Sequence, residues 1–154
     1  MIRKMIEMKT NIKIDNRKAK YDYFIEKTIE CGISLSGNEI KSIRNGLCSL
    51  KESYAAIENH EVYLKQCHIT KYSSANAFDV DENRNRKLLL HKKEILMLEN
   101  DIKMLGYTLI PLQIYFTDNH KCKCLLGLCK GKKNYDKRNS LKERTMKRDI
   151  ERFK

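Results

Sequence analysis

Residues Tyr107–Lys130, YTLIPLQIYFTDNHKCKCLLGLCK, hold the pattern that decides the fold. Two runs rich in apolar and β-branched residues flank Asp118–Asn119, a pair typical of tight turns, so the segment predicts an antiparallel hairpin. Within Lys121–Cys124, charged and small apolar residues alternate, which indicates one wet and one core-facing side of a strand. The sole proline of the chain, Pro111, should lie at a sheet edge or a bulge, because it has no N–H to donate.

Two further segments predict strands. Tyr21–Leu35, YDYFIEKTIECGISL, is rich in aromatic and β-branched residues. Gly32 would interrupt a helix there and instead suggests a bulge or bend in a strand. Ser53–Ile69, SYAAIENHEVYLKQCHI, predicts a second hairpin that turns at Glu58–Glu61.

Helical patterns occupy two other places. Ser36–Gly46, SGNEIKSIRNG, predicts a short helix, with Ser36 or Asn38 as its cap and Asn45–Gly46 as its end. Leu88–Gly106, LLLHKKEILMLENDIKMLG, predicts a long amphipathic helix. Between the second hairpin and this helix, the polar stretch Thr70–Arg86 predicts a long loop.

Together these elements predict a mainly β protein. We expect a small antiparallel barrel, similar to the oligonucleotide-binding (OB) fold, with about two or three helices. The 154 residues suffice for one such domain. The expected division is a flexible arm over residues 1–15, a barrel over 16–130 and a basic tail over 131–154.

The charge of the chain is concentrated in its tail. The formal net charge is +12. From Lys130 to the end there are eleven Lys or Arg against four Asp or Glu, a net charge of +7. Such a tail favours a polyanion, with nucleic acid ahead of an anionic membrane surface, and a merely solubilising run remains the alternative.

The sequence argues against several other classes of protein. No segment approaches the ~20 apolar residues of a spanning helix, and the first residues lack the apolar run of a signal peptide. The six cysteines therefore read as reduced cytosolic thiols. A single C-x-C pair, Cys122 and Cys124, without a matching second pair predicts no metal site.

No catalytic constellation is visible either. The phosphate-binding glycine loop, the G-x-S-x-G elbow and the H-E-x-x-H motif are all missing. The four histidines are scattered, and the best acidic cluster, Asp79, Asp81 and Glu82, falls in the predicted loop. We therefore expect no enzyme activity and no cofactor.

Five separated blocks resemble one family. NRKAKYDYFIE (16–26), EIKSIRNG (39–46), ESYA (52–55), RKLLLHKKEI (86–95) and GLCKGKKNYDKR (127–138) closely resemble the transfer-messenger-RNA-binding small protein B family. The resemblance implies an OB-like barrel that binds the tRNA-like part of transfer-messenger RNA. It also implies entry into stalled ribosomes, rescue by trans-translation, and a cytoplasmic location.

Specific residues follow from the resemblance and from charge. Family RNA-binding positions align with Asn16, Glu30 and Leu90, and family tail positions with Gly131 and with Asp136–Arg138. The full set predicted to bind the RNA is Asn16, Arg17, Lys18, Lys20, Tyr21, Glu30, Lys41, Arg44, Arg86, Lys87 and Leu90. The set predicted for ribosomal RNA at the decoding centre is Gly131, Lys132, Lys133, Tyr135, Asp136, Lys137, Arg138, Lys142, Arg144, Lys147 and Arg148.

Some of these assignments stay open from the residues alone. The cations of Arg17–Lys20 suit phosphates or an ordinary solvated edge. Glu30 can accept from base amino groups or simply be an exposed strand residue. Leu88–Leu90 is most simply a core segment, so only the resemblance suggests an RNA contact for Leu90.

The tail has too few apolar side chains to form a core. Fixing a residue costs roughly 1–2 kcal/mol, and the buriable residues of the tail offset only a fraction of this. We therefore expect disorder beyond about Asp136 in the free protein and helix formation on ribosomal RNA, with Gly131 as hinge and Tyr135 stacking on a base. A basic ribosomal protein, a membrane-surface protein and an RNA-modifying enzyme remain the alternatives.

Overall fold

The computed structural model describes residues 12–72 and 81–152, with the backbone alone at 134–136 and 140. Thirteen elements follow one another along this part of the chain. They are β1 (Lys13–Asp15), α2 (Arg17–Asp22), β2 (Tyr23–Ile33), α3 (Gly37–Arg44), β3 (Cys48–Ser49), β4 (Tyr54–Glu58), β5 (Glu61–Lys65), β6 (His68–Ile69), β7 (Arg86–Leu89), α4 (Lys92–Leu105), β8 (Thr108–Phe116), β9 (Cys122–Gly131) and α5 (Asn134–Arg152).

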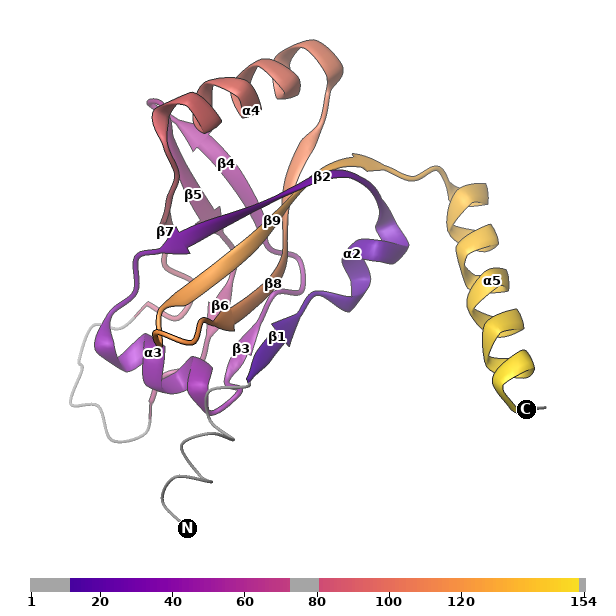
Figure 1. Cartoon of the computed structure of the whole chain (residues 1–154), viewed down its shortest axis with the longest axis horizontal. Coiled ribbons are helices and arrows are strands. Elements are labelled where there is room, and N and C mark those ends of the chain that lie inside the picture. Colours follow the sequence, from indigo (N-terminus) through magenta and orange to yellow (C-terminus); the bar gives the residue numbers. More distant parts are fainter. Residues whose placement is uncertain (1–11, 73–80, 153–154) are drawn as a thin grey trace.

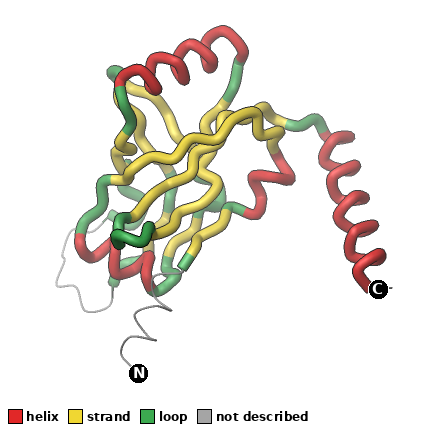
Figure 2. The backbone as a smooth tube through the Cα atoms, viewed as in Figure 1, coloured by secondary structure: helices red, strands yellow, loops and turns green. Residues whose placement is uncertain are grey.

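The main sheet closes on itself as an antiparallel barrel. Its strand order is β1-β8-β4-β5-β7-β2-β9, and β8 also pairs with β9, so the barrel closes between these two strands. β1 adds to the outer edge of β8. A small second sheet, β3-β6, lies outside this order. In Figures 1 and 2 the strands wrap around a common interior while α4 lies across one end. The expected mainly β, antiparallel architecture is thus confirmed.

The hairpin predicted over Tyr107–Lys130 forms the wall at which the barrel closes. β8 and β9 pair from Thr108 opposite Cys129 to Phe116 opposite Cys122. The register shifts between Pro111 and Gln113, so the proline lies at a bulge as predicted.

Two other local predictions are confirmed. Ser36 caps α3 in a capping box with Glu39, and Gly46, with φ +73°, follows the helix end. The turn between β4 and β5 places Asn59 and His60 at positive φ, as a two-residue hairpin turn requires.

The N-terminal segment differs from the prediction. Lys13–Asp15 pairs with β8, so the end of the expected flexible arm is a strand, while residues 1–11 lie outside the described part. Arg17–Asp22 is a helix rather than the start of the long strand. It buries Ala19 against Ile110 and Cys129, a tertiary contact that local propensity does not reveal.

Gly32 does not form the expected bend. The irregularity of β2 lies between Ile25 and Lys27, and Gly32 stays in register with Leu89 on one side and Lys123 on the other. A side chain at Gly32 would meet Leu89 at 3.2 Å. The glycine therefore allows close packing of β7 on β2.

The long predicted helix begins later than expected. Arg86–Leu89 forms β7, within which Arg86 and Leu88 are buried while Lys87 and Leu89 are exposed. α4 begins at Lys92 and ends at Leu105, and the next residue, Gly106, caps it at φ +69°. Pairing of β7 with both β2 and β5 outweighs the helical preference of the leucines. The predicted loop thus ends in a strand, and residues 73–80 lie outside the described part.

Arg86 is fully buried, which corrects its prediction as an RNA-binding residue. Its Nε donates to Glu39 Oε2 at 2.5 Å. Its Nη1 donates to the Cys67 and Arg84 carbonyls at 2.6 and 2.9 Å, and its Nη2 to the Glu82 carbonyl at 3.1 Å. The guanidinium thus joins α3, β7 and the segments next to β5 and β6.

The tail forms the helix α5, although we expected it to be disordered in the free protein. Its main contact with the body is to α2. Leu141, Met146 and Ile150 are 48, 64 and 59% exposed, so they form no core. Local propensity therefore accounts for the helix, with little support from tertiary contacts. This lack of buried apolar side chains is also the reason why we expected disorder in the free protein.

Glu39→Gln should lower the free energy of unfolding by about 3–5 kcal/mol, because it leaves a buried guanidinium without its counter-charge. Chemical denaturation at pH 7 measures this loss. The matched control is Glu58→Gln, which removes an exposed ion pair with Lys65 and should change stability little. An equal effect of the two substitutions would contradict the structural importance of the buried pair.

The same pair predicts a pH dependence. Burial alone would raise the pKa of Glu39, but hydrogen bonds from the Ser36 amide and from Arg84 and Arg86 outweigh it and lower this pKa below 4.5. The stabilisation is therefore complete above pH 4.5 and is lost as the pH falls through the lowered pKa. Glu39→Gln should lack this part of the acid transition.

Candidate nucleic-acid interface

A groove on the barrel brings together three of the predicted RNA-binding residues. Glu30 on β2, Lys87 on β7 and Leu90 beside α4 all line a cavity of about 450 Å³. The side chains of His60 and Lys123 lie in the same lining. We call this feature, whose lining also includes Glu61, Leu89 and Glu94, the barrel groove. Its mixture of cations, carboxylates and apolar surface suits a partner with phosphates and base edges.

Glu30 is held in place by a tyrosine that the sequence analysis missed. Tyr115 on β8 donates its hydroxyl to Glu30 Oε2. Burial and this hydrogen bond together raise the pKa of Tyr115, so the phenol keeps its proton at neutral pH. The carboxylate of Glu30 is exposed and keeps acceptor capacity for a ligand. Because Tyr115 lies 85 residues away in sequence, local pattern could not reveal the contact.

Lys87, which lines the barrel groove, forms a surface ion pair with Glu61. Its Nζ lies 2.9 Å from Glu61 Oε1, and its side chain is 45% exposed. The hydrogen bond from Lys87, with a second from Tyr63, lowers the pKa of Glu61. Such an exposed pair is weak, so a phosphate can replace Glu61 as the partner of Lys87.

The apolar surface of the barrel groove comes from two neighbouring leucines. Leu90 is half-buried and packs against the core, as the residues alone suggested. Leu89 is 55% exposed and lines the same cavity. The alternation of β7 therefore makes Leu89, which was not predicted, the more accessible apolar side chain.

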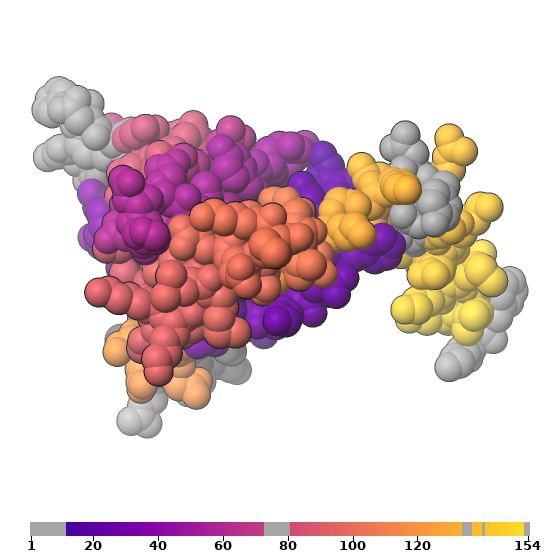
Figure 3. Space-filling view, turned by 90° about the horizontal axis from the view of Figure 1, so that it is seen from above, coloured from indigo at the N-terminus to yellow at the C-terminus, as the bar shows by residue number. Residues whose placement is uncertain are grey.

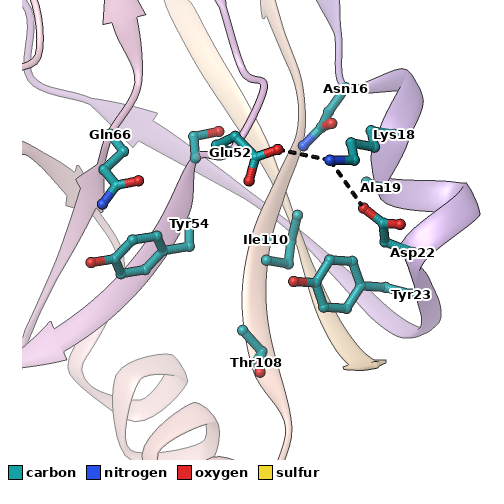
Figure 4. A pocket seen from close by; sticks show the side chains of 11 residues that line it. Asn16, Lys18, Ala19, Asp22, Tyr23, Glu52, Tyr54, Gln66, Thr108 and Ile110 are labelled. Carbon is teal, nitrogen blue, oxygen red and sulfur yellow. Dashed lines mark hydrogen bonds and ion pairs between the residues drawn. The ribbon is translucent and has the colours of Figure 1, made fainter. Parts of the chain in front are cut away.

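Asn16 and Lys18 lie elsewhere, around a cavity of about 350 Å³ between α2, β4 and β8 (Figure 4). The Asn16 side-chain amide donates to the Pro111 carbonyl at 2.8 Å, which fixes α2 on the bulge of β8. Lys18 lies 2.7 Å from Glu52, and this hydrogen bond raises the pKa of Lys18. Asp22 lies 4.0 Å from the same ammonium. The role of Asn16 in this structure is thus to position the helix.

The remaining predicted residues of the body are spread over α2 and α3. Arg17 and Lys20 are exposed on α2. On α3, Lys41 lies 5.6 Å from the Tyr72 ring and Arg44 5.3 Å from the Phe116 ring, which are cation–π distances. None of these four side chains lines the barrel groove. The predicted set therefore divides into three groups, one in the groove, one around α2 and one on α3, rather than forming one site.

The root of the tail is attached to the C-terminal end of α2. The Lys132 amide donates to the Asp22 carbonyl at 2.9 Å, and Lys132 Nζ donates to the Lys20 carbonyl at 3.1 Å. Lys137 lies 3.4 Å from the Asp22 carboxylate and 5.9 Å from the Tyr21 ring. Asp22 therefore binds the tail through Lys132 and Lys137. It was not predicted, because the sequence analysis selected mainly basic residues for the RNA-binding set.

Beyond this root, the tail presents its cations to solvent. Figure 3 shows α5, in yellow, standing off the body. Gly131 is the last residue of β9 and pairs with Tyr23. The exposed cations among the described tail residues are Lys133, Arg138, Lys142, Arg144, Lys147, Arg148 and Arg152. The side chains of Tyr135 and Asp136 lie outside the described part, so their predicted roles stay predictions.

Among the described residues, no group of three or more His, Cys, Asp or Glu side chains could hold a metal ion. No helix within the same ranges is long and apolar enough to cross a membrane.

Comparisons with known proteins place the chain in a family. The family model described as SmpB protein matches residues 13–154. The chain is 53% identical over 138 residues to the SsrA-binding proteins of Staphylococcus aureus strains Newman and COL, covering 90% of this chain and 89% of each relative.

A solved structure is also similar. It is described as "tmRNA-SmpB: a journey to the center of the bacterial ribosome", and its matching chain has a TM-score of 0.67 and 40% sequence identity. The match covers 84% of this chain and 94% of that one. The chain therefore belongs to the SmpB protein family.

Proposed function

We propose that this chain binds SsrA RNA, also called transfer-messenger RNA (tmRNA), and delivers it to stalled ribosomes for trans-translation. The support is the family, the SsrA-binding relatives and the similar chain from a tmRNA–SmpB ribosome structure. Its role is that of a non-catalytic RNA-binding factor, and its place is the cytoplasm, where ribosomes are.

The single observation that carries the proposal is the barrel groove. It joins a hydroxyl-anchored carboxylate, Glu30, with the exposed cation of Lys87 and the apolar surface of Leu89 and Leu90. A folded RNA offers all three complements: base amino groups for the carboxylate, phosphates for the cation and base faces for the leucines. We assign the barrel groove to the tRNA-like part of the RNA.

The tail takes a different part in the proposal. Its exposed cations lie along the whole length of α5, which fits a channel lined with ribosomal phosphates. The residues from Gly131 onward therefore form a separate functional unit, which reads the vacant decoding centre and message path. The contacts of Lys132 and Lys137 with α2 set the direction in which this unit leaves the barrel.

RNA capture tests the function directly. Purification of the tagged chain from its own cells, after crosslinking, should bring down one small structured RNA in excess over every other species. The protein should also be substoichiometric to ribosomes. Constant one-to-one recovery with ribosomal RNA would contradict the proposal and favour a ribosomal protein.

Glu30→Gln should weaken binding of SsrA RNA by about tenfold or more, since a hydrogen bond that a charged carboxylate accepts contributes roughly 1.5–3 kcal/mol. Tyr115→Phe should cause a smaller loss, because it removes only the hydroxyl that holds Glu30. Filter binding or fluorescence anisotropy measures both.

The matched control is Glu26→Gln, an exposed carboxylate on the same strand and outside the barrel groove. It should leave the affinity within about twofold, because no groove contact is lost. Equal losses of RNA affinity in the Glu26 and Glu30 variants would show a general effect of charge and would contradict the assignment of the barrel groove as the RNA-binding site.

A further inference from the structure

Two of the six cysteines lie with their sulfur atoms in contact. Cys48 Sγ on β3 is 3.8 Å from Cys67 Sγ, which follows β5. Both cysteines are reduced in the structure. β3 and β6 pair beside them, with Cys48 opposite Ile69, so two strand segments already hold the two residues together. A disulfide requires the sulfurs to approach to about 2.05 Å, a small change of side-chain rotation from this distance.

The two thiols differ in their access to solvent. Cys67 is 0% exposed. Cys48 is half-buried and lines a surface cavity of about 260 Å³ between β1, α2 and β3. Arg17, Lys18 and Lys51 also line this cavity. A small oxidant can therefore reach Cys48 from outside, while Cys67 is accessible only through Cys48.

The surroundings of Cys67 favour its thiolate. The hydrogen bond between the two thiols lowers the pKa of Cys67 against the effect of its burial, and the nearby Arg86 guanidinium adds to this lowering. The same hydrogen bond, together with burial, raises the pKa of Cys48, so the pair holds its negative charge on Cys67 and its proton on Cys48. Arg86 is fixed there by its 2.6 Å hydrogen bond to the Cys67 carbonyl. Thiolate character and a neighbouring thiol are the two features shared by cysteines that form reversible disulfides.

We propose that Cys48 and Cys67 form an oxidation site that closes as an intramolecular disulfide when a peroxide-class oxidant is present. The hydrogen bond between the two sulfurs passes the Cys48 proton to Cys67 as the Cys48 sulfur attacks the peroxide O–O bond, which breaks and leaves Cys48 as a sulfenic acid and a hydroxide. The hydroxide takes that proton from Cys67 and leaves as one water. The Cys67 thiolate then attacks that sulfur, the S–S bond forms, and the hydroxide leaves as a second water. Two thiols are oxidised, one hydrogen peroxide is reduced, and a thiol reductant reverses the change.

The other cysteines lack this arrangement. Cys31 and Cys124 lie opposite each other on β2 and β9, and the Cys31 Sγ donates to the Cys124 carbonyl at 3.3 Å. Both are buried, at 2 and 0% exposed, so neither offers an accessible thiol to an oxidant. Burial raises the pKa of Cys129 to about 11 and that of Cys122 to about 12, and among the described contacts neither thiol has a hydrogen bond to a second sulfur that could take its proton. Oxidation should therefore select the Cys48–Cys67 pair. Neither residue lines the barrel groove.

Peptide mapping of the full-length folded protein tests the site. The protein is treated with hydrogen peroxide at neutral pH, alkylated with N-ethylmaleimide in denaturant and digested without reduction. We expect a linked peptide pair joining Cys48 and Cys67, an intact mass lower by two hydrogens before alkylation, and loss of both signals on adding dithiothreitol. Absence of the linked pair, or links spread evenly over the six cysteines, would overturn the proposal.

Two variants separate the site from general oxidation. Cys122→Ser keeps the pair and should form the link as fast as the parent protein. Cys48→Ser removes the accessible thiol, and Cys67 should then stay alkylatable after the same peroxide treatment. Formation of the link only when denaturant accompanies the peroxide would also overturn the proposal, because the link would then come from the unfolded chain.

Discussion

The structure depends on one buried cation. A guanidinium with no exposed surface must have its charge and its donors satisfied inside the protein, and Arg86 meets this need with Glu39 and three carbonyl groups. Its burial also sets the register of β7. Because side chains alternate along a strand, an inward Arg86 and Leu88 place Lys87 and Leu89 on the outer face, in the barrel groove. A slip of one residue would expose the guanidinium and bury Lys87.

Local sequence signals predicted the elements whose cause is local. The cap at Ser36, one of the two residues predicted for it, the bulge at Pro111, for which a sheet edge was the alternative, and the turn within Glu58–Glu61 all follow from the chemistry of a few adjacent residues. The errors lie where tertiary contacts decide. α2 forms because Ala19 packs on β8, and the leucines of β7 are a strand because β2 and β5 lie on either side. Neither contact has a signature within the segment itself.

The site was predictable to a similar degree. The family resemblance led to Glu30 and Leu90, and charge led to Lys87, and these three line one groove. Charge also led to Arg86, wrongly, since a basic residue in a binding block was read as exposed. Asp22 and Tyr115 escaped because each acts by holding another residue: Asp22 holds Lys137 and Tyr115 holds Glu30. Such supporting contacts depend on the fold, so they become visible only with it.

In the proposed function, the barrel binds a folded RNA, and the exposed cationic tail recognises an empty message channel. Removal of residues 131–154 tests this division most directly. The shortened protein should bind SsrA RNA with the affinity of the full chain, yet add no tags to proteins on stalled ribosomes in a reconstituted translation system. Tagging at the full-length rate, or loss of RNA affinity together with tagging, would contradict it.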